Sequence, residues 1–211
     1  LLRETARFPQ NQVGTDPPQK FTGAGFFMAR RRDRERPGAA TYTGLMPPST
    51  RETVASDWVV SVRTAFPNMA NPLGTLFGGE VLALMDVGAA IAAQRFCRKV
   101  VVTASTEPID FRNPIHVGEI VELKSRVAWT GRTSMIVRCE VHGENPLTGE
   151  RRLCTIGHLN FVAIGADGRP AEVPQLRVET EMEKRHWQTG ERVRQDIERR
   201  RQRKAPEPSE P

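Results

Sequence analysis

One carboxylate, Asp86, lies in the middle of an otherwise apolar stretch that begins at two adjacent glycines, Gly78 and Gly79. An unpaired ionised carboxylate in apolar surroundings costs folding free energy, so we expect it to have a partner or a functional role. Asp86 follows Gly79 by seven positions, about two helical turns, so both face the same side of a helix. The free N–H groups and positive dipole of a first turn favour developing negative charge. The stretch therefore predicts an oxyanion site beside a carboxylate.

Two further polar clusters flank this helix in the sequence. Asn71 lies on the turn-rich loop before the glycines and offers an amide donor near the helix start. The run Thr103-Ala104-Ser105-Thr106 follows one short loop after the helix. Two interpretations of Asp86 stay open from these residues. It is a buried acid satisfied by a neighbouring N–H or hydroxyl, as most buried polar groups are, or it belongs to a reactive site.

The sequence gives little support to covalent or metal-based chemistry. It contains no G-x-S-x-G nucleophile elbow, no H-E-x-x-H motif and no cluster of Cys and His, and its four histidines are scattered. The three cysteines, Cys97, Cys139 and Cys154, lack C-x-x-C spacing, and an odd count gives no closed disulfide framework. We therefore expect reduced, buried thiols in a cytoplasmic protein, no metal, and a carboxylate that activates water.

The hydrophobic pattern predicts an α+β fold. From Glu80 to about Phe96, apolar and small residues occur nearly all round the helix, which predicts a buried helix. Runs rich in Val, Ile and Thr predict one strand before this helix and four after it, at residues 54–64, 100–111, 119–130, 133–142 and 152–164. Consecutive strands with short turns favour an antiparallel sheet, and one buried helix suits a sheet curled around it.

The two ends of the chain differ from this core. Residues 1–52 contain two proline pairs and no sustained helix or strand period, so we expect a disordered or weakly ordered extension. Residues 53–175 are expected to form one domain, and residues 176–211 a charged, exposed helix and tail. The chain begins with Leu1, and Met28 and Met46 precede the first predicted strand, so translation of the first 45 or so residues stays an open question.

The formal net charge of +6 lies outside the predicted domain. Residues 51–174 hold 13 basic and 13 acidic side chains, whereas residues 1–50 and 175–211 carry excesses of four and two basic side chains. Acids flank the basic runs, which nearly lack aromatics, so solvated tails are favoured over a nucleic-acid surface. Asp86 interrupts the longest apolar run before it reaches the length of a membrane span. We expect neither nucleic acid nor a membrane as partner.

Five motifs follow one another along the predicted domain. They are N-x-x-G-x-x-x-G-G at 71–79, L-x-x-M-D at 82–86, VVTAS at 101–105, D-F-x-x-P-I-x-V-G at 110–118 and G-R-T-S-M at 131–135. In this order and spacing they resemble the hot-dog-fold acyl-CoA thioesterases of the acyl-CoA hydrolase type. The stretch P-Q-L-x-x-E-T-E at 174–181 is similar to the C-terminal signature of the same group. The resemblance covers about residues 54–194 and implies a single hot-dog domain.

The resemblance implies hydrolysis of the thioester of acyl-CoA to a free fatty acid and CoA. Asp86 would act as general base on water, or as nucleophile, while Asn71 and the Gly79 backbone N–H polarise the thioester carbonyl. No cofactor is implied beyond the CoA of the substrate. Active sites of the family lie between protomers, so Asn71 of one protomer would serve Asp86 of the other. At least a homodimer is implied, with a hexameric trimer of dimers as an open alternative.

The CoA end of the substrate needs donors for its phosphates and strand edges for its amides. The positions that resemble those of the family are Ala104, Ser105 and Thr106 on one strand, and Arg132, Thr133, Ser134 and Met135 at a turn. Two other functions stay open. A non-catalytic acyl-CoA sensor would use the same pocket, whereas a hydratase or dehydratase of this fold needs a His beside the Asp, which the helix lacks. The preferred acyl chain and any nucleotide regulation are not specified.

Overall fold

The computed structural model describes residues 51–203, so the prediction for residues 1–50 lies outside its range. In chain order the elements are β1 (Thr53–Val54), β2 (Val59–Thr64), the 3-10 helix η1 (Pro67–Met69), α1 (Gly78–Cys97), β3 (Val100–Thr106), β4 (Ile120–Thr130), β5 (Ser134–Glu144), β6 (Arg151–Ile164), β7 (Gln175–Leu176) and α2 (Glu181–Arg203). The predicted strand at 100–111 ends at Thr106, because Pro108 lacks a backbone donor.

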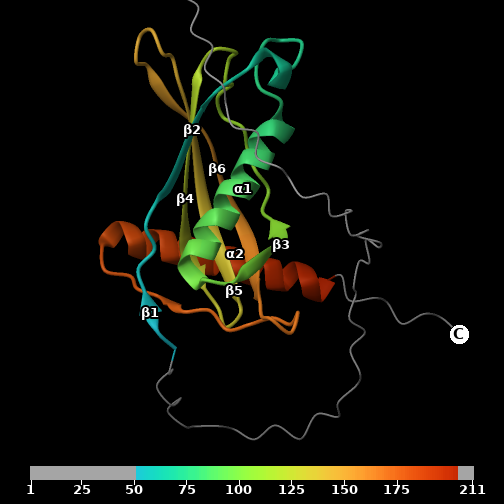
Figure 1. Cartoon of the computed structure of the whole chain (residues 1–211), viewed down its shortest axis with the longest axis vertical. Helices are drawn as coiled ribbons and strands as arrows, with labels where there is room; N and C mark the ends of the chain where they lie inside the picture. Colours follow the sequence, from blue (N-terminus) through green and yellow to red (C-terminus); the bar gives the residue numbers. More distant parts are fainter. Residues whose placement is uncertain (1–50, 204–211) are drawn as a thin grey trace, which may run out of the picture. The chain divides into compact units, whose positions relative to one another are not determined.

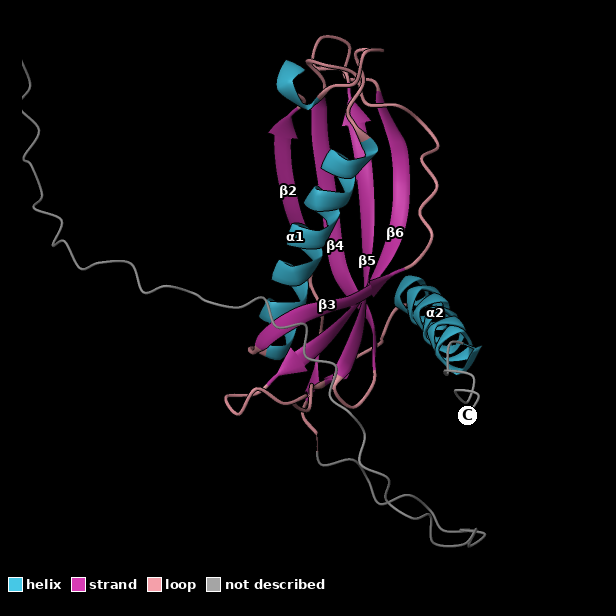
Figure 2. Cartoon of the chain, turned by 90° about the vertical axis from the view of Figure 1, so that its right-hand side faces the viewer, coloured by secondary structure: helices cyan, strands magenta, loops and turns pink. Residues whose placement is uncertain are grey.

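Five strands form one antiparallel sheet in the order β2-β4-β5-β6-β3. Figures 1 and 2 show this sheet curled around α1, with β2 and β3 at its edges. The short strands β1 and β7 pair in parallel outside the main sheet, so the predicted strand at 54–64 is interrupted between Val54 and Val59. The predicted α+β architecture, an antiparallel sheet wrapped around a central helix, is confirmed.

The core lies between α1 and the concave face of the sheet. Met85 and Ala89 on the helix are fully buried among strand side chains such as Val137 and Phe161. Two glycines permit the close approach of α1 to the sheet. A Cβ on Gly88 would lie 2.4 Å from Leu123, and a Cβ on Gly157 would lie 2.4 Å from the Met85 methyl group. This tight packing fixes the helix over the sheet and therefore sets the position of Asp86, next to Met85.

One long face of α1 is exposed in the single chain, so the prediction of a helix buried on all sides does not hold there. Val87 is 60% exposed, and Leu82 and Ile91 are also exposed. A single curled sheet covers only one side of a helix, whereas the apolar residues occur all round it. On the neighbouring edge strand β3, Val100 and Val102 are exposed as well. Exposed apolar residues gathered on neighbouring elements are typical of a protein–protein interface.

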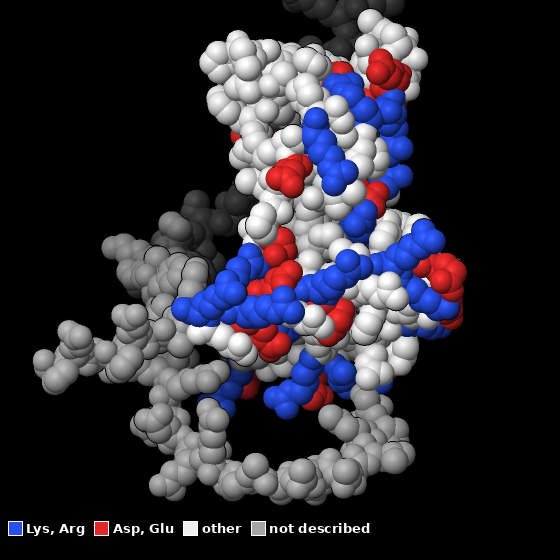
Figure 3. Space-filling view, turned by 180° about the vertical axis from the view of Figure 1, so that it is seen from behind, with Lys and Arg blue, Asp and Glu red and all other residues white. Residues whose placement is uncertain are grey.

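The predicted C-terminal helix is present as α2, and one side of it packs across the outer face of the sheet (Figure 2). A Cβ on Gly190 would lie 2.6 Å from Trp129 Cβ, and Ile197 is buried against Trp129. Glu183 pairs with Arg126 of β4 at 2.8 Å. Seen from behind, basic and acidic side chains are interleaved over this region (Figure 3). The apolar seam is too short to appear as a stripe in the sequence.

A histidine beneath α2 makes stability depend on pH. Burial, and then the charges of Arg138 and His186, lower the pKa of His158 to about 4. As pH falls from about 6.5 to about 4, the unfolded chain takes up a proton that the folded chain does not, so stability falls through this window. Urea unfolding at pH 7 and pH 4.5 should show a loss of stability, of which on the order of 2 kcal/mol comes from His158 and is removed in His158→Gln.

The unsubstituted protein, unfolded at the same two pH values, is the reference for His158→Gln. An equal acid loss in His158→Gln and in the unsubstituted protein would show that His158 is not the group responsible. The negative charge of Glu140 acts in the opposite direction to Arg138 and His186 and raises the pKa of His158.

In the described range, residues 51–203, no helix combines the length and the apolar character needed to span a membrane.

Candidate active site

The first turn of α1 is open to a ligand. Phe77, at the N-cap position, provides no side-chain hydrogen bond to the helix start, although first-turn N–H groups need acceptors from outside the helix. A Cβ on Gly79 would meet nothing within 4 Å, whereas one on Gly78 would lie 3.2 Å from the Phe111 ring. Close packing against Phe111 therefore explains the glycine at 78, whereas the glycine at 79 borders open space at the helix start. Both glycines stand where the sequence predicts an oxyanion site.

Asp86 has a specific partner on the neighbouring strand. Thr103 Oγ1 donates a hydrogen bond of 2.7 Å to Asp86 Oδ1. Both side chains lie on the side of the molecule where α1 is exposed. Thr103 is absent from the predicted site residues, although it belongs to the VVTAS motif. The sequence signal was a hydroxyl within that motif, but only the pairing of β3 with the sheet brings it to the carboxylate.

A β-bulge in β3 decides which side chains reach Asp86. Thr103 pairs with Phe161, but Ser105 pairs with Asn160, so Ala104 is the extra residue. As a result Thr103 and Thr106 line the same cavity of about 330 Å³ together with Asp86. Ser105 does not line this cavity, and its hydroxyl is buried without a hydrogen-bond partner among the described residues. Of the predicted strand positions 104–106, only Thr106 faces the carboxylate.

The predicted CoA-binding turn lies elsewhere in the chain. Arg132 and Thr133 lie in the turn between β4 and β5, and Ser134 and Met135 begin β5. None of the four lines the cavity beside Asp86. Met135 is fully buried in the core, so its side chain has no free surface for a ligand. Arg132 is exposed, and its carbonyl accepts the Val173 N–H at 2.9 Å. Within one chain this turn and Asp86 are not brought together, and its binding of CoA stays a prediction.

Asn71 is fixed in the loop that leads into α1. Its side-chain oxygen accepts the N–H of Leu73 at 2.9 Å, and its amide nitrogen donates to Thr75 Oγ1 at 2.9 Å. These bonds hold the side chain in a turn of the kind that asparagine favours. The loop then continues through Leu76, whose N–H donates to the Ile115 carbonyl at 2.8 Å. Asn71 is thus anchored on the approach to the helix start.

The start of α1 and Asp86 are too far apart to act on one carbonyl group within a single chain. A rise of about 1.5 Å per residue puts Gly79 and Asp86 about 10 Å apart along the axis. A reacting group must come within about 3–3.5 Å of its target. Within one chain these two groups are therefore not brought together.

The cysteines offer no competing nucleophile. All three are free and buried, as predicted. Burial raises the pKa of Cys139 to about 12, and burial also raises the pKa of Cys97 and of Cys154. These thiols therefore stay protonated near neutral pH, whereas the thiolate is the reactive form. Within residues 51–203, no three His, Cys, Asp or Glu side chains gather in a way that could hold a metal ion.

Comparison with known proteins settles the family. The model of the thioesterase superfamily matches residues 73–150. An uncharacterized acyl-CoA thioester hydrolase of Bacillus subtilis is 42% identical over 125 residues, which cover 59% of this chain and 73% of that protein. This chain belongs to the acyl-CoA thioester hydrolases. Mammalian members of the family are longer than this thioesterase, which spans 31% of the cytosolic acyl coenzyme A thioester hydrolase of Homo sapiens.

Solved structures resemble this thioesterase in fold as well as in sequence. A hexameric acyl-CoA thioesterase is 40% identical, with a TM-score of 0.68 over 71% of this chain and 97% of the other. An acyl-CoA hydrolase of Staphylococcus aureus, solved with coenzyme A and with an asparagine replaced by alanine, is 31% identical, with a TM-score of 0.68 over 73% and 94% of the two chains. Further structures of that hydrolase replace an aspartate and a threonine by alanine.

Proposed function

We propose that this thioesterase hydrolyses acyl-CoA to a fatty acid and CoA, with Asp86 as the general base or nucleophile. The proposal rests on one observation: the uncapped helix start at Gly79 and the Asp86 carboxylate lie on the same exposed face of α1. The helix start suits the oxyanion that forms when a thioester carbonyl is attacked. The carboxylate suits the activation of water. The proposed reaction needs no cofactor apart from the CoA of its substrate.

A second copy of the chain would complete the site. The exposed face of α1 carries apolar residues on both sides of Asp86, among them Leu82 and Val87. The edge strand β3 lies beside it with Val100 exposed. Covering this surface with the same surface of another chain forms an isologous dimer. In such a dimer Asp86 of one chain can approach Gly79 of the other, which removes the separation of about 10 Å within one chain.

The spacing of three residues supports the same assignment. In the Staphylococcus aureus hydrolase, the replaced aspartate lies fifteen positions after the replaced asparagine, and the replaced threonine lies seventeen positions after the aspartate. Asn71, Asp86 and Thr103 have the same spacing in this chain. The primary amide of Asn71 has two N–H donors, and one of them is bonded to Thr75 Oγ1. The other can bind the thioester carbonyl together with the Gly79 N–H.

The proposed reaction proceeds in two steps. Asp86 accepts a proton from a water molecule as the water oxygen attacks the thioester carbon, and the negative charge on the carbonyl oxygen is stabilised by the Gly79 and Asn71 N–H groups. The tetrahedral intermediate then collapses, the carbon–sulfur bond breaks, and the proton held by Asp86 passes to the sulfur of CoA. In the nucleophilic variant, Asp86 attacks the thioester carbon, the carbon–sulfur bond breaks and CoA leaves as its thiolate. Water then hydrolyses the resulting mixed anhydride to the fatty acid and free Asp86.

The direct test is the release of free CoA thiol from acyl-CoAs of two to sixteen carbons, about the range from acetyl to palmitoyl, measured with a thiol reagent. Turnover of any of these substrates supports the proposed function and ranks the chain lengths. Binding of CoA by calorimetry without turnover of any of them would instead indicate an acyl-CoA sensor that uses the same pocket.

Thr103 should position Asp86 during this reaction. Thr103→Val removes the hydroxyl that donates to Asp86 at 2.7 Å while keeping the side-chain shape. A hydrogen bond to a charged group contributes about 1.5–3 kcal/mol, so we expect kcat to fall about 10- to 100-fold. Thr103→Ser keeps the hydroxyl and should keep most of the activity. A fall in KM or kcat of equal size in both variants would indicate a packing effect instead.

A further inference from the structure

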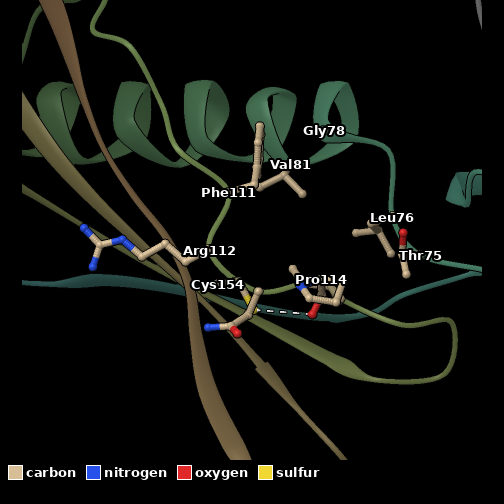
Figure 4. A pocket seen from close by; sticks show the side chains of 10 residues that line it. Thr75, Leu76, Gly78, Val81, Phe111, Arg112, Pro114 and Cys154 are labelled. Carbon is tan, nitrogen blue, oxygen red and sulfur yellow. Dashed lines mark hydrogen bonds between the residues drawn. The ribbon is translucent and has the colours of Figure 1, made fainter.

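A second cavity, of about 360 Å³, lies beside the first turn of α1 (Figure 4). Its apolar lining comes from both sides of the helix start and from the loop that precedes β4, and consists of Leu76, Val81, Phe111, Pro114, Ile115 and Cys154. Figure 4 shows Phe111 directed toward Gly78 and Val81, whereas the guanidinium of Arg112 points away from them. The cavity is therefore suited to an apolar group.

Two polar side chains at this cavity are already engaged with the protein, and the guanidinium of Arg112, which also lines it, points away from Gly78 and Val81 (Figure 4). Asn113 Nδ2 donates to the Leu153 carbonyl at 2.8 Å, and Thr75 Oγ1 accepts from Asn71. A ligand with unpaired charges or donors would lose hydrogen bonds with water without replacing them here. The phosphates and amides of CoA are such groups, whereas a hydrocarbon chain is not.

The loop that forms one wall is held in place before any ligand arrives. Arg152 donates to the Pro114 carbonyl at 2.9 Å and to Glu119 at 2.6 Å. Glu119 also accepts the His116 N–H at 2.8 Å, and Thr155 donates to the Asp110 carbonyl at 2.7 Å. These bonds tie both ends of the loop to β6, so the cavity is largely preformed, as small-molecule sites usually are.

The cavity lies next to the proposed oxyanion site. Gly78 lines the cavity, and the next residue, Gly79, provides the N–H group assigned to the thioester oxygen. A thioester carbonyl bound at Gly79 would therefore have its acyl chain at the entrance of the cavity. Phe111 stands at this entrance, because its ring lies 3.2 Å from the site of a Gly78 Cβ and is about half exposed.

We infer that this cavity binds the acyl chain of the substrate, and that Phe111 and Val81 set the chain length that it accepts. The inference rests on the proposed function and adds the location of the acyl group to it. Phe111 limits access from the entrance, and Val81, which is buried on α1, occupies the helix side of the cavity. The cavity beside Asp86 remains for water and the reacting thioester.

Two substitutions of opposite effect test the inference. Phe111→Ala opens the entrance, so kcat/KM for long acyl chains relative to acetyl-CoA should rise about tenfold. Val81→Phe fills the cavity, so the same ratio should fall about tenfold or more. Phe66→Ala is the matched control, because Phe66 is similarly exposed and lies outside the cavity lining. It should leave the ratio unchanged.

The outcomes separate the two proposals. If the unsubstituted protein releases CoA but Phe111→Ala leaves the ratio of long to short chains unchanged, the acyl-chain assignment is wrong and the hydrolase assignment stands. If the unsubstituted protein releases no CoA from any acyl-CoA, the proposed function itself is wrong. Phe111 is exposed enough that its replacement should not prevent folding, so the test does not depend on the buried Val81.

Discussion

Asp86→Asn should lower kcat for acyl-CoA hydrolysis about a thousandfold, because the amide cannot accept a proton from water while it keeps the size of the carboxylate. Thr103 can still donate its hydrogen bond to the amide oxygen, so the position of the side chain should be preserved. We expect affinity for CoA to change little. The measurement is release of CoA thiol at saturating substrate, together with calorimetric binding of CoA.

Asp167→Asn is the matched control, since Asp167 lies in an exposed turn and makes only a local bond to the Arg169 N–H. It should leave kcat unchanged. If Asp86→Asn instead retained more than about a tenth of the turnover, proton transfer to this carboxylate would not be part of the rate-limiting chemistry.

Co-expression of two inactive variants should restore activity. Asn71→Ala removes an oxyanion donor and should lower kcat about 100-fold or more, and Asp86→Asn removes the base. If each site takes Asn71 from one chain and Asp86 from the other, a mixed dimer contains one site with both groups intact. Random pairing makes about half of the dimers mixed, so about a quarter of the activity should return.

Separate affinity tags on the two variants allow the mixed dimers to be isolated and assayed alone, where about half of the activity is expected. Mixing the two proteins after purification, under conditions in which chains do not exchange, is the control and should restore nothing. Mixed dimers as inactive as the parents would place Asn71 and Asp86 of one chain in the same site, although Gly79 and Asp86 lie about 10 Å apart along α1.

Local patterns in the sequence were sufficient for much of the fold. The apolar run from Gly78 predicted α1 to within a residue or two, and the alternation of Val, Ile and Thr predicted the long strands β4, β5 and β6. Both patterns arise from contacts that repeat along one element, so they appear in the sequence of that element alone. The apolar pattern alone predicted a fully buried α1, because apolar residues look the same whether they face their own sheet or a second chain. Only the family resemblance implied that a single domain leaves this helix partly uncovered.

The sequence by itself determined which groups can do chemistry here: a carboxylate at Asp86, an open helix start at Gly79 and an amide at Asn71, at spacings that residue types and helical geometry fix. The tertiary structure alone decided what surrounds them. The bulge at Ala104 turns Thr103 and Thr106 toward Asp86 and Ser105 away, and Phe111 packs near Gly78 at the edge of a cavity. Each of these depends on contacts between residues distant in the chain, which the pattern along a single strand or helix does not record.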